Sequence, residues 1–150
     1  MVRGAVAVVC LCARTQRCAL IRRGKPPDLG KWSLPGGSIH TGERAIDAAL
    51  RELSEETGLR SDDVRFCGRP FATSDVIVPS DGSKFHYLIA QAFCTTAEPI
   101  EPSLTPGDDA SEAAWFSLDV MSGMHDREEI AGDCLAVVER AFSLRAHGLL

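Results

Sequence analysis

The chain has 150 residues, of which 45% are hydrophobic and 25% are charged, and its formal net charge at pH 7 is −5. This length and composition are typical of a globular protein, so we expect one domain over residues 1–150. The negative charge provides no general attraction to nucleic acid or to an anionic membrane, and no stretch is long enough to span a bilayer. An anionic substrate would therefore have to be bound through cations or local basic residues.

The start of the chain predicts two strands followed by a loop. Residues 4–13 are rich in Val and Ala, which predicts a strand buried on both faces, and residues 18–22 predict a second strand. Residues 23–31 contain two prolines and two glycines and predict a loop. Its basic side chains either help to bind phosphate groups or are simply solvated. Trp32 could stack on a base, but a packing role is favoured. The candidate substrate residues in this part of the chain are Arg22, Arg23, Lys31 and Trp32.

The middle of the chain predicts three more strands. Residues 64–71 predict one strand, and residues 75–78 and 85–94 predict a hairpin joined by residues 79–83. The second arm of the hairpin is apolar on both sides, so we expect it to be central in its sheet. It carries His86, which is interpreted as a satisfied core histidine or a substrate contact rather than as a metal ligand.

The last third of the chain predicts a long loop, a strand and a helix. Residues 97–109 contain three prolines and no periodicity, and a loop of this length in a compact domain is usually functional or disordered. Residues 113–118 predict a short strand, and residues 128–142 predict an amphipathic closing helix. The order of elements indicates an α/β fold with a mixed sheet and helices on both faces.

Six cysteines are scattered without a CxxC pair or metal-like spacing: Cys10, Cys12, Cys18, Cys67, Cys94 and Cys134. Reduced, core-packed thiols in a cytoplasmic protein are the expected state. Residues 5–13 could imitate the core of a signal peptide, but a buried strand is the preferred interpretation because the fold needs this element.

A glycine-rich loop followed by a helix lies between the two groups of predicted strands. Thr41 is the expected N-cap of this helix, and Gly58 is expected to end it in a left-handed conformation. On a helical wheel, three carboxylates share one arc, namely those of Glu52, Glu55 and Glu56. An adjoining apolar arc would pack into the core; it contains Ile46, Ala49, Leu50 and Leu53.

Grouping these carboxylates costs the helix about 0.2–0.5 kcal/mol per pair, and a solvated acidic face is the alternative interpretation. The acids follow the turn Pro35-Gly36-Gly37, whose backbone carbonyls can approach an ion. Hard cations such as Mg²⁺ take oxygen ligands and are usually bound by a few carboxylates and substrate phosphates. The pattern therefore favours a cation site.

The spacing of these residues resembles the Nudix box at every defined position: Gly37, five residues, Glu43, seven residues, then Arg51-Glu52-Leu53-Ser54-Glu55-Glu56-Thr57-Gly58-Leu59. Residues 20–24 and 30–37 resemble the strand and loop before the box, and residues 107–116 resemble the late loop and strand of ADP-ribose pyrophosphatase-like members. The resemblance implies a Nudix-type α/β/α sandwich with a mixed β-sheet. It also implies Mg²⁺- or Mn²⁺-dependent cleavage of a nucleoside diphosphate linked to another moiety, with an ADP-ribose-like substrate favoured.

The resemblance further implies roles for the residues of the box. The metal ions would be bound by Glu52, Glu55 and Glu56 together with the Gly37 carbonyl. Arg51 and Glu43 would form an orienting pair that holds the loop and the helix in register.

The residue that deprotonates the attacking water stays open between a late-loop acid and the box glutamate Glu55. The late acids are Asp108, Asp109 and Glu112. Glu112 is the first candidate and Asp109 the second, because a longer side chain can cross from the loop to the metal centre. A capped and solvated turn is the alternative interpretation of these acids.

Two other functions remain as alternatives: a nucleoside triphosphate pyrophosphohydrolase that clears damaged nucleotides, and a non-catalytic Nudix module that senses a nucleotide. The expected partner is a small nucleoside diphosphate derivative rather than nucleic acid or a membrane. A homodimer is one of the assemblies that we consider.

Overall fold

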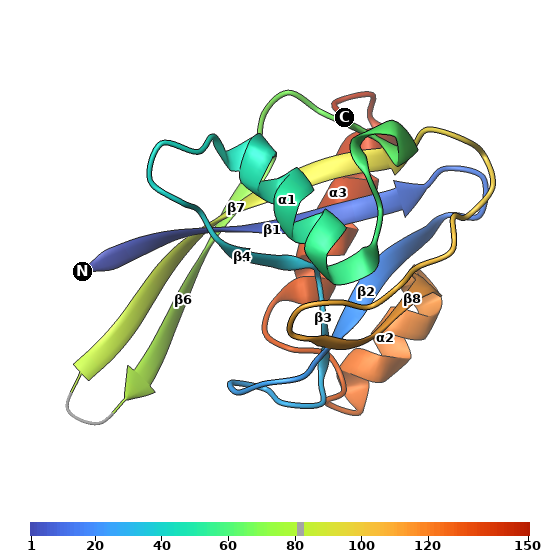
Figure 1. Ribbon diagram of the computed structural model, residues 1–150. Coiled ribbons are helices and arrows are strands. Elements are labelled where there is room, and N and C mark those ends of the chain that lie inside the picture. Colours follow the sequence, from blue (N-terminus) through green and yellow to red (C-terminus); the bar gives the residue numbers. More distant parts are fainter. Residues whose placement is uncertain (81–82) are drawn as a thin grey trace.

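The computed structural model describes residues 1–80 and 83–150, and within them a mixed sheet of eight strands lies between helices (Figure 1). The strands are β1 (Val2–Cys12), β2 (Arg17–Arg23), β3 (Trp32–Ser33), β4 (Gly36–Ser38), β5 (Val64–Phe66), β6 (Ala72–Ser80), β7 (Ser83–Thr96) and β8 (Ala110–Ser117). The helices are α1 (Ala45–Thr57), α2 (Leu118–Asp126) and α3 (Cys134–Ala146), with a 3₁₀ turn at Ser61–Asp63. The predicted α/β fold with a mixed sheet is confirmed.

A parallel pair of strands forms the centre of the sheet. β1 pairs with β7 from Val2↔His86 to Leu11↔Thr95, and the order across the sheet is β3-β2-β1-β7-β5. Three antiparallel strands complete it, with β4 on β1, β6 on β7 and β8 on β2. Most of β1 from Ala5 onward is buried, which confirms the prediction of a strand covered on both faces.

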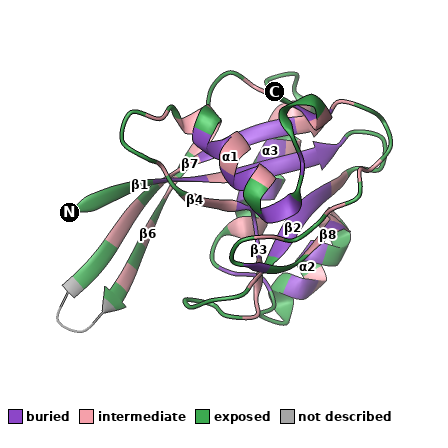
Figure 2. Ribbon diagram, in the orientation of Figure 1, coloured by how far each residue is buried: buried purple, intermediate pink, exposed green. Residues whose placement is uncertain are grey.

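Side chains of β1 alternate between two cores, as the period of a strand requires. One core contains Val6, Val8 and Cys10 and is covered by α1, which contributes Ala48, Ala49 and Leu53. The other contains Val9 and Leu11 and is covered by α2 and α3, which contribute Met121, Met124, Val137, Val138 and Ala141. Helices therefore cover both faces of the sheet, as Figures 1 and 2 show.

The ends of α1 agree only in part with the prediction. The expected N-cap Thr41 is wrong, because the cap residue is Arg44 and it makes no side-chain capping bond. Gly58 has φ 77° and its N–H donates to the Ser54 carbonyl, which confirms the left-handed C-terminal end. The apolar arc is confirmed, since Ala49 and Leu53 are fully buried.

The predicted closing helix over residues 128–142 is wrong at its start. α2 was not expected; it begins after Ser117, whose hydroxyl accepts a bond from the Val120 N–H. Glu128 has a positive φ of 58°, which ends helical geometry there, and α3 begins only at Cys134. Ile130 forms a bridge with Trp32, so the apolar residue taken as helical belongs to an extended segment.

The hairpin of β6 and β7 is confirmed, although the tip of its predicted connection, at 81–82, lies outside the described residues. Only the second half of β7 is buried; in the first half Leu88 is 44% exposed, because the hairpin projects from the rest of the sheet (Figure 2). The strand predicted over residues 64–71 ends at Phe66, before Gly68 and Pro70, which do not favour a regular strand. The predicted loop over residues 97–109 is confirmed.

All six cysteines are free thiols, and Cys10, Cys12, Cys18 and Cys94 are buried. No helix in residues 1–80 or 83–150 is long and apolar enough to cross a membrane.

Candidate active site

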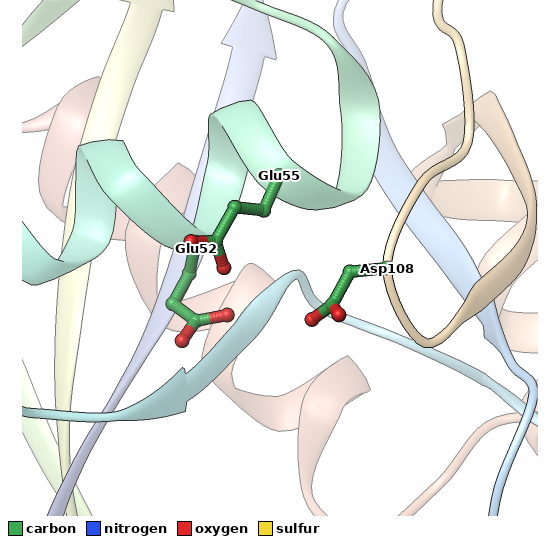
Figure 3. Close-up of side chains that lie close together, drawn as sticks. All are labelled: Glu52, Glu55 and Asp108. Atoms are coloured by element: carbon green, nitrogen blue, oxygen red, sulfur yellow. The ribbon is translucent and has the colours of Figure 1, made fainter.

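Three carboxylates from two parts of the chain converge beside the glycine loop. Glu52 and Glu55 project from α1, and Asp108 projects from the loop before β8 (Figure 3). One carboxylate oxygen of each residue lies within 4.8 Å of those of the other two. Oxygen ligands at such mutual distances suit a hard divalent cation.

Glu52 is buried directly against β4. A methyl group at Gly37 would stand 2.5 Å from Oε1 of Glu52, so a larger residue at this position would displace this carboxylate. Glu52 is 8% exposed, and burial raises its pKa, while Arg51 beside it acts in the opposite direction. The carboxylate therefore lies packed between the loop and the helix.

Glu56 is the most buried of the three predicted box acids, at 5% exposure. Burial raises the pKa of its carboxyl group to about 7, although the Gly36 N–H donates a 2.8 Å hydrogen bond to its Oε1 and favours the charged form. Glu56 is thus bonded to the glycine loop and lies outside the cluster that Glu52 and Glu55 form with Asp108. The predicted ligand set and the observed cluster therefore overlap at Glu52 and Glu55.

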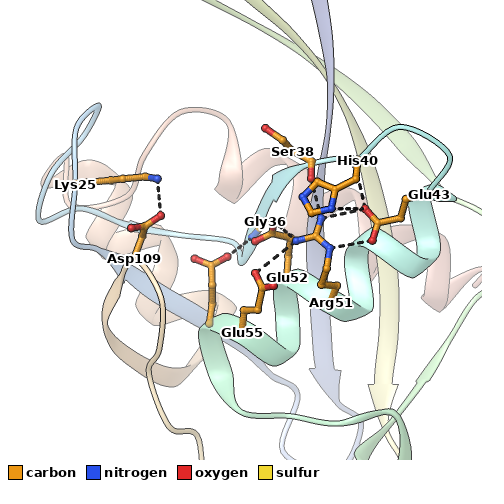
Figure 4. A network of polar contacts seen from close by, with 10 residues as sticks. Lys25, Gly36, Ser38, His40, Glu43, Arg51, Glu52, Glu55 and Asp109 are labelled. Atoms are coloured by element: carbon orange, nitrogen blue, oxygen red, sulfur yellow. Dashed lines mark hydrogen bonds and ion pairs between the residues drawn. The ribbon is translucent and has the colours of Figure 1, made fainter.

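Arg51 links the loop to the helix, as predicted (Figure 4). Its Nε and Nη2 donate to the two carboxylate oxygens of Glu43 at 2.9 and 3.0 Å. Its Nη2 also donates to the Ser38 carbonyl at 2.9 Å, and its Nη1 donates to Oε1 of Glu52 at 2.8 Å. The guanidinium holds the pKa of Glu43 at about 2, well below its usual range. Arg51 and Glu43 are therefore in contact, and the contact extends to Glu52; the orienting role of the pair stays a prediction.

The two favoured late-loop acids lie in ion pairs with basic residues. Asp109 pairs with Lys25 (Figure 4), and Glu112 pairs with Arg22 at 3.3 Å. The acid that reaches the box is Asp108, which has a positive φ of 52°. Asp108 and Asp109 therefore have different partners, and no pattern in the sequence shows which of the two reaches the box.

Three of the candidate substrate residues lie together beside a cavity of about 450 Å³. Its lining consists of Arg22, Leu29, Gly30, Lys31, Trp32, Glu128 and Glu129. Trp32 is half-buried and packs edge-on against Phe116, with ring centroids 4.8 Å apart, which agrees with the favoured packing role. Arg23 donates from Nε to the Pro27 carbonyl within its own loop.

His86 lies on the projecting hairpin, and its Nε2 is 2.6 Å from Oδ1 of Asp75. Its side chain is 35% exposed, so the interpretation as a core histidine is wrong. Its interpretation as a substrate contact stays a prediction.

The sequence is similar to a named protein family and to named proteins. The NUDIX domain family matches residues 1–135. A protein of Methanocaldococcus jannaschii named ADP-ribose pyrophosphatase is 32% identical over 130 residues, which cover 86% of this chain and 72% of that protein.

The fold of this chain is similar to the folds of solved structures. The NUDIX domain of NrtR from Shewanella oneidensis, in complex with ADP ribose, has a TM-score of 0.74 at 20% identity and covers 95% of this chain and 88% of that one. A bifunctional NMN adenylyltransferase/ADP ribose pyrophosphatase from Francisella tularensis, with AMP and a Mn ion, has a TM-score of 0.73 at 19% identity, covering 95% of this chain and 42% of that one. At these identities the likeness concerns the fold alone. With a complete box, a family match over most of its length and this fold, the chain belongs to the NUDIX domain family.

Proposed function

We propose that this protein is a Nudix hydrolase that cleaves the diphosphate linkage of a nucleoside diphosphate joined to another moiety, with ADP-ribose as the favoured substrate. The observation that carries the proposal is the convergence of Glu52, Glu55 and Asp108 beside the glycine loop. The relative named ADP-ribose pyrophosphatase supports the choice of substrate. Hydrolysis would break one P–O bond of the diphosphate and add the elements of water, giving AMP and ribose 5-phosphate.

We propose Mg²⁺ or Mn²⁺ as the cofactor, bound by Glu52, Glu55 and Asp108 together with Glu56 and the Gly37 carbonyl. The residues fit such an ion because the donors are oxygens and because Gly37 leaves space that a Cβ atom would fill. When bound, these metals neutralise phosphate charge and lower the pKa of a coordinated water.

The protein's own residues would orient the acids and accept a proton. Arg51 fixes Glu52 by a 2.8 Å hydrogen bond and restrains Glu55 more weakly, at 3.5 Å. The Glu55 side chain is 43% exposed, so its carboxylate is accessible to water. Because Glu55 lies in the cluster with Glu52 and Asp108, whereas Glu112 and Asp109 do not, Glu55 becomes the first candidate for the general base.

A panel of candidate substrates tests this function. ADP-ribose, NADH, dinucleoside polyphosphates, sugar nucleotides and nucleoside triphosphates are incubated with the protein and Mg²⁺, and the products are separated by chromatography. We expect AMP and ribose 5-phosphate from ADP-ribose, and no product when a chelator is in excess. Preferential release of pyrophosphate from a triphosphate would instead favour the nucleotide-clearing function, and binding without turnover would favour a sensor. Full activity with excess chelator would contradict the metal centre.

We also propose a homodimer. Its support is the projecting hairpin, where large apolar side chains are exposed: Ile77 at 55%, Leu88 at 44% and Phe85 at 38%. Sedimentation velocity at several concentrations would show the dimer, and a monomer at all concentrations would contradict it.

A cytoplasmic location is proposed as well, supported by six free thiols. A fluorescent fusion observed in the source cells would test it.

A further inference from the structure

Asp108 stands in a tight turn that packs directly on α1. The Ala110 N–H donates to the Gly107 carbonyl at 3.0 Å, and Asp108 between them has the positive φ of 52° that non-glycine residues rarely adopt. A methyl group at Gly107 would stand 2.5 Å from the Glu55 carbonyl oxygen. The turn therefore touches the backbone of the helix whose acids Asp108 faces.

The loop that leads into this turn is bonded to the rest of the fold at several points. The indole Nε1 of Trp115 donates to the Pro102 carbonyl at 2.9 Å, and the Thr105 N–H donates to the Thr57 carbonyl at 2.8 Å. Arg17 forms an ion pair with Glu101 at 3.1 Å. These contacts fix the path of the chain before it reaches Gly107.

The chain leaving the turn is held by the basic loop over residues 23–31. The Gly24 N–H donates to the Asp109 carbonyl at 2.8 Å, and Nζ of Lys25 forms an ion pair with Oδ2 of Asp109 (Figure 4). Asp109 follows Asp108 directly, so these two contacts fix the side of the turn that the helix does not touch.

We propose that Lys25 is a positioning residue, which acts through Asp109 to keep Asp108 facing Glu52 and Glu55. This proposal rests on the proposed function, because it assigns Asp108 to the metal centre. The side chains of Lys25 and Asp109 are 60% and 45% exposed, and exposed ion pairs contribute little to global stability. The consequence of the pair is therefore expected at the site rather than in the folding of the protein.

Another role for Lys25 would give a different pattern of effects. A lysine that bound substrate phosphate directly would act independently of Asp108, and its loss would raise KM with little change in kcat. A positioning lysine acts only while Asp108 is present, so its loss should lower kcat and weaken cation binding. Its effect should then disappear in an Asp108→Asn background.

The experiment compares the whole protein with Lys25→Ala, Lys25→Arg, Asp108→Asn and the double variant Lys25→Ala/Asp108→Asn. Mn²⁺ affinity is measured by electron paramagnetic resonance without substrate, and kcat and KM are measured with ADP-ribose. Arg127→Ala is the matched control, because Arg127 and its partner Glu129 are 61% and 47% exposed. Thermal unfolding shows that each variant folds.

We expect Lys25→Ala to weaken Mn²⁺ binding and to lower kcat by about tenfold, the low end of the range for residues that support metal ligands. Lys25→Arg should recover most of the loss, and Arg127→Ala should change neither quantity. The double variant should lose no more than Asp108→Asn alone. Additive losses, or a raised KM with unchanged kcat and Mn²⁺ affinity, would overturn the positioning role.

The Mn²⁺ measurement separates this proposal from the proposed function. If no substrate is hydrolysed but Lys25→Ala still weakens Mn²⁺ binding in a manner that depends on Asp108, the hydrolase assignment fails and the positioning role stands. If the unmodified protein does not bind Mn²⁺, both are overturned.

Discussion

Gly37 lies so close to Glu52 that a Cβ atom on it would stand 2.5 Å from Oε1 and 2.6 Å from Cδ of that carboxylate. We therefore expect Gly37→Ala to displace the Glu52 side chain and to weaken Mn²⁺ binding and turnover by about tenfold or more. The displaced atoms are the end of a flexible side chain, so the fold should persist. Calorimetric Mn²⁺ titration and steady-state kinetics measure the effect.

The control for this substitution is Gly68→Ala, since a Cβ atom at Gly68 would meet nothing within 4 Å. Equal effects of the two alanines would show that the contact between Gly37 and Glu52 has no special role.

Arg51→Lys should lower both thermal stability and activity. A lysine keeps the positive charge but cannot donate to Glu43, Ser38 and Glu52 at the same time, as the guanidinium does. Thermal unfolding and turnover are compared with Arg140→Lys, a change at an exposed position of α3. Normal stability with an altered substrate preference would place Arg51 on the ligand instead.

The late-loop acids should differ sharply in their effects. Asp108→Asn should lower kcat by about 10-fold to 100-fold and weaken Mn²⁺ binding, because Asp108 faces Glu52 and Glu55. Glu112→Gln should lower kcat little, because Glu112 pairs with Arg22 and both side chains are exposed. The two variants are compared by measuring their turnover as a function of pH. A larger loss of kcat for Glu112→Gln than for Asp108→Asn would restore Glu112 as the first candidate for the general base.

Glu56 should make the stability of the metal-free protein depend on pH. Its folded-state pKa of about 7 is above the ordinary value of 4.5, so the folded state favours the protonated form. This contribution to the free energy of unfolding is fully present below about pH 4.5 and is lost as pH rises through about 7. Its size is on the order of 3 kcal/mol. Denaturant unfolding in chelator between pH 5 and pH 8 measures it.

Glu56→Gln should remove this part of the pH dependence, because an amide does not titrate. Adding Mg²⁺ near pH 8 should stabilise the unmodified protein more than the variant. Parallel pH profiles of the two proteins would contradict the assigned pKa.

Local patterns predicted the elements whose residues share one face. The strand of β1, the apolar arc of α1 and its end at Gly58 all follow from spacing along a regular backbone. The contact of Arg51 with Glu43 was expected only from the resemblance to the Nudix box, because Glu43 lies before the helix begins. The start of α3 could not be found in this way, because the left-handed Glu128 interrupts an apolar pattern that remains periodic. The expectation of one domain over residues 1–150 stays a prediction.

The choice between Asp108 and Asp109 also lay beyond the sequence. The two acids are adjacent and identical in type, yet Asp108 lies with Glu52 and Glu55 while Asp109 pairs with Lys25. The turn that contains Asp108 lies against residues distant in the chain: Gly107 lies beside the Glu55 carbonyl, and the Asp109 carbonyl accepts a hydrogen bond from the Gly24 N–H. A single sequence contains no signal for such contacts.

The pairing of β8 with β2 brings the late turn to the box helix, so the cluster of acids depends on a strand that is synthesised after every other strand of the described residues. A nascent chain that ends before β8 would expose the box carboxylates without Asp108 opposite them. Full affinity for a divalent ion would then arise only after β8 has been synthesised and has paired with β2. The complete cluster of acids would thus form only when β8 has paired with β2.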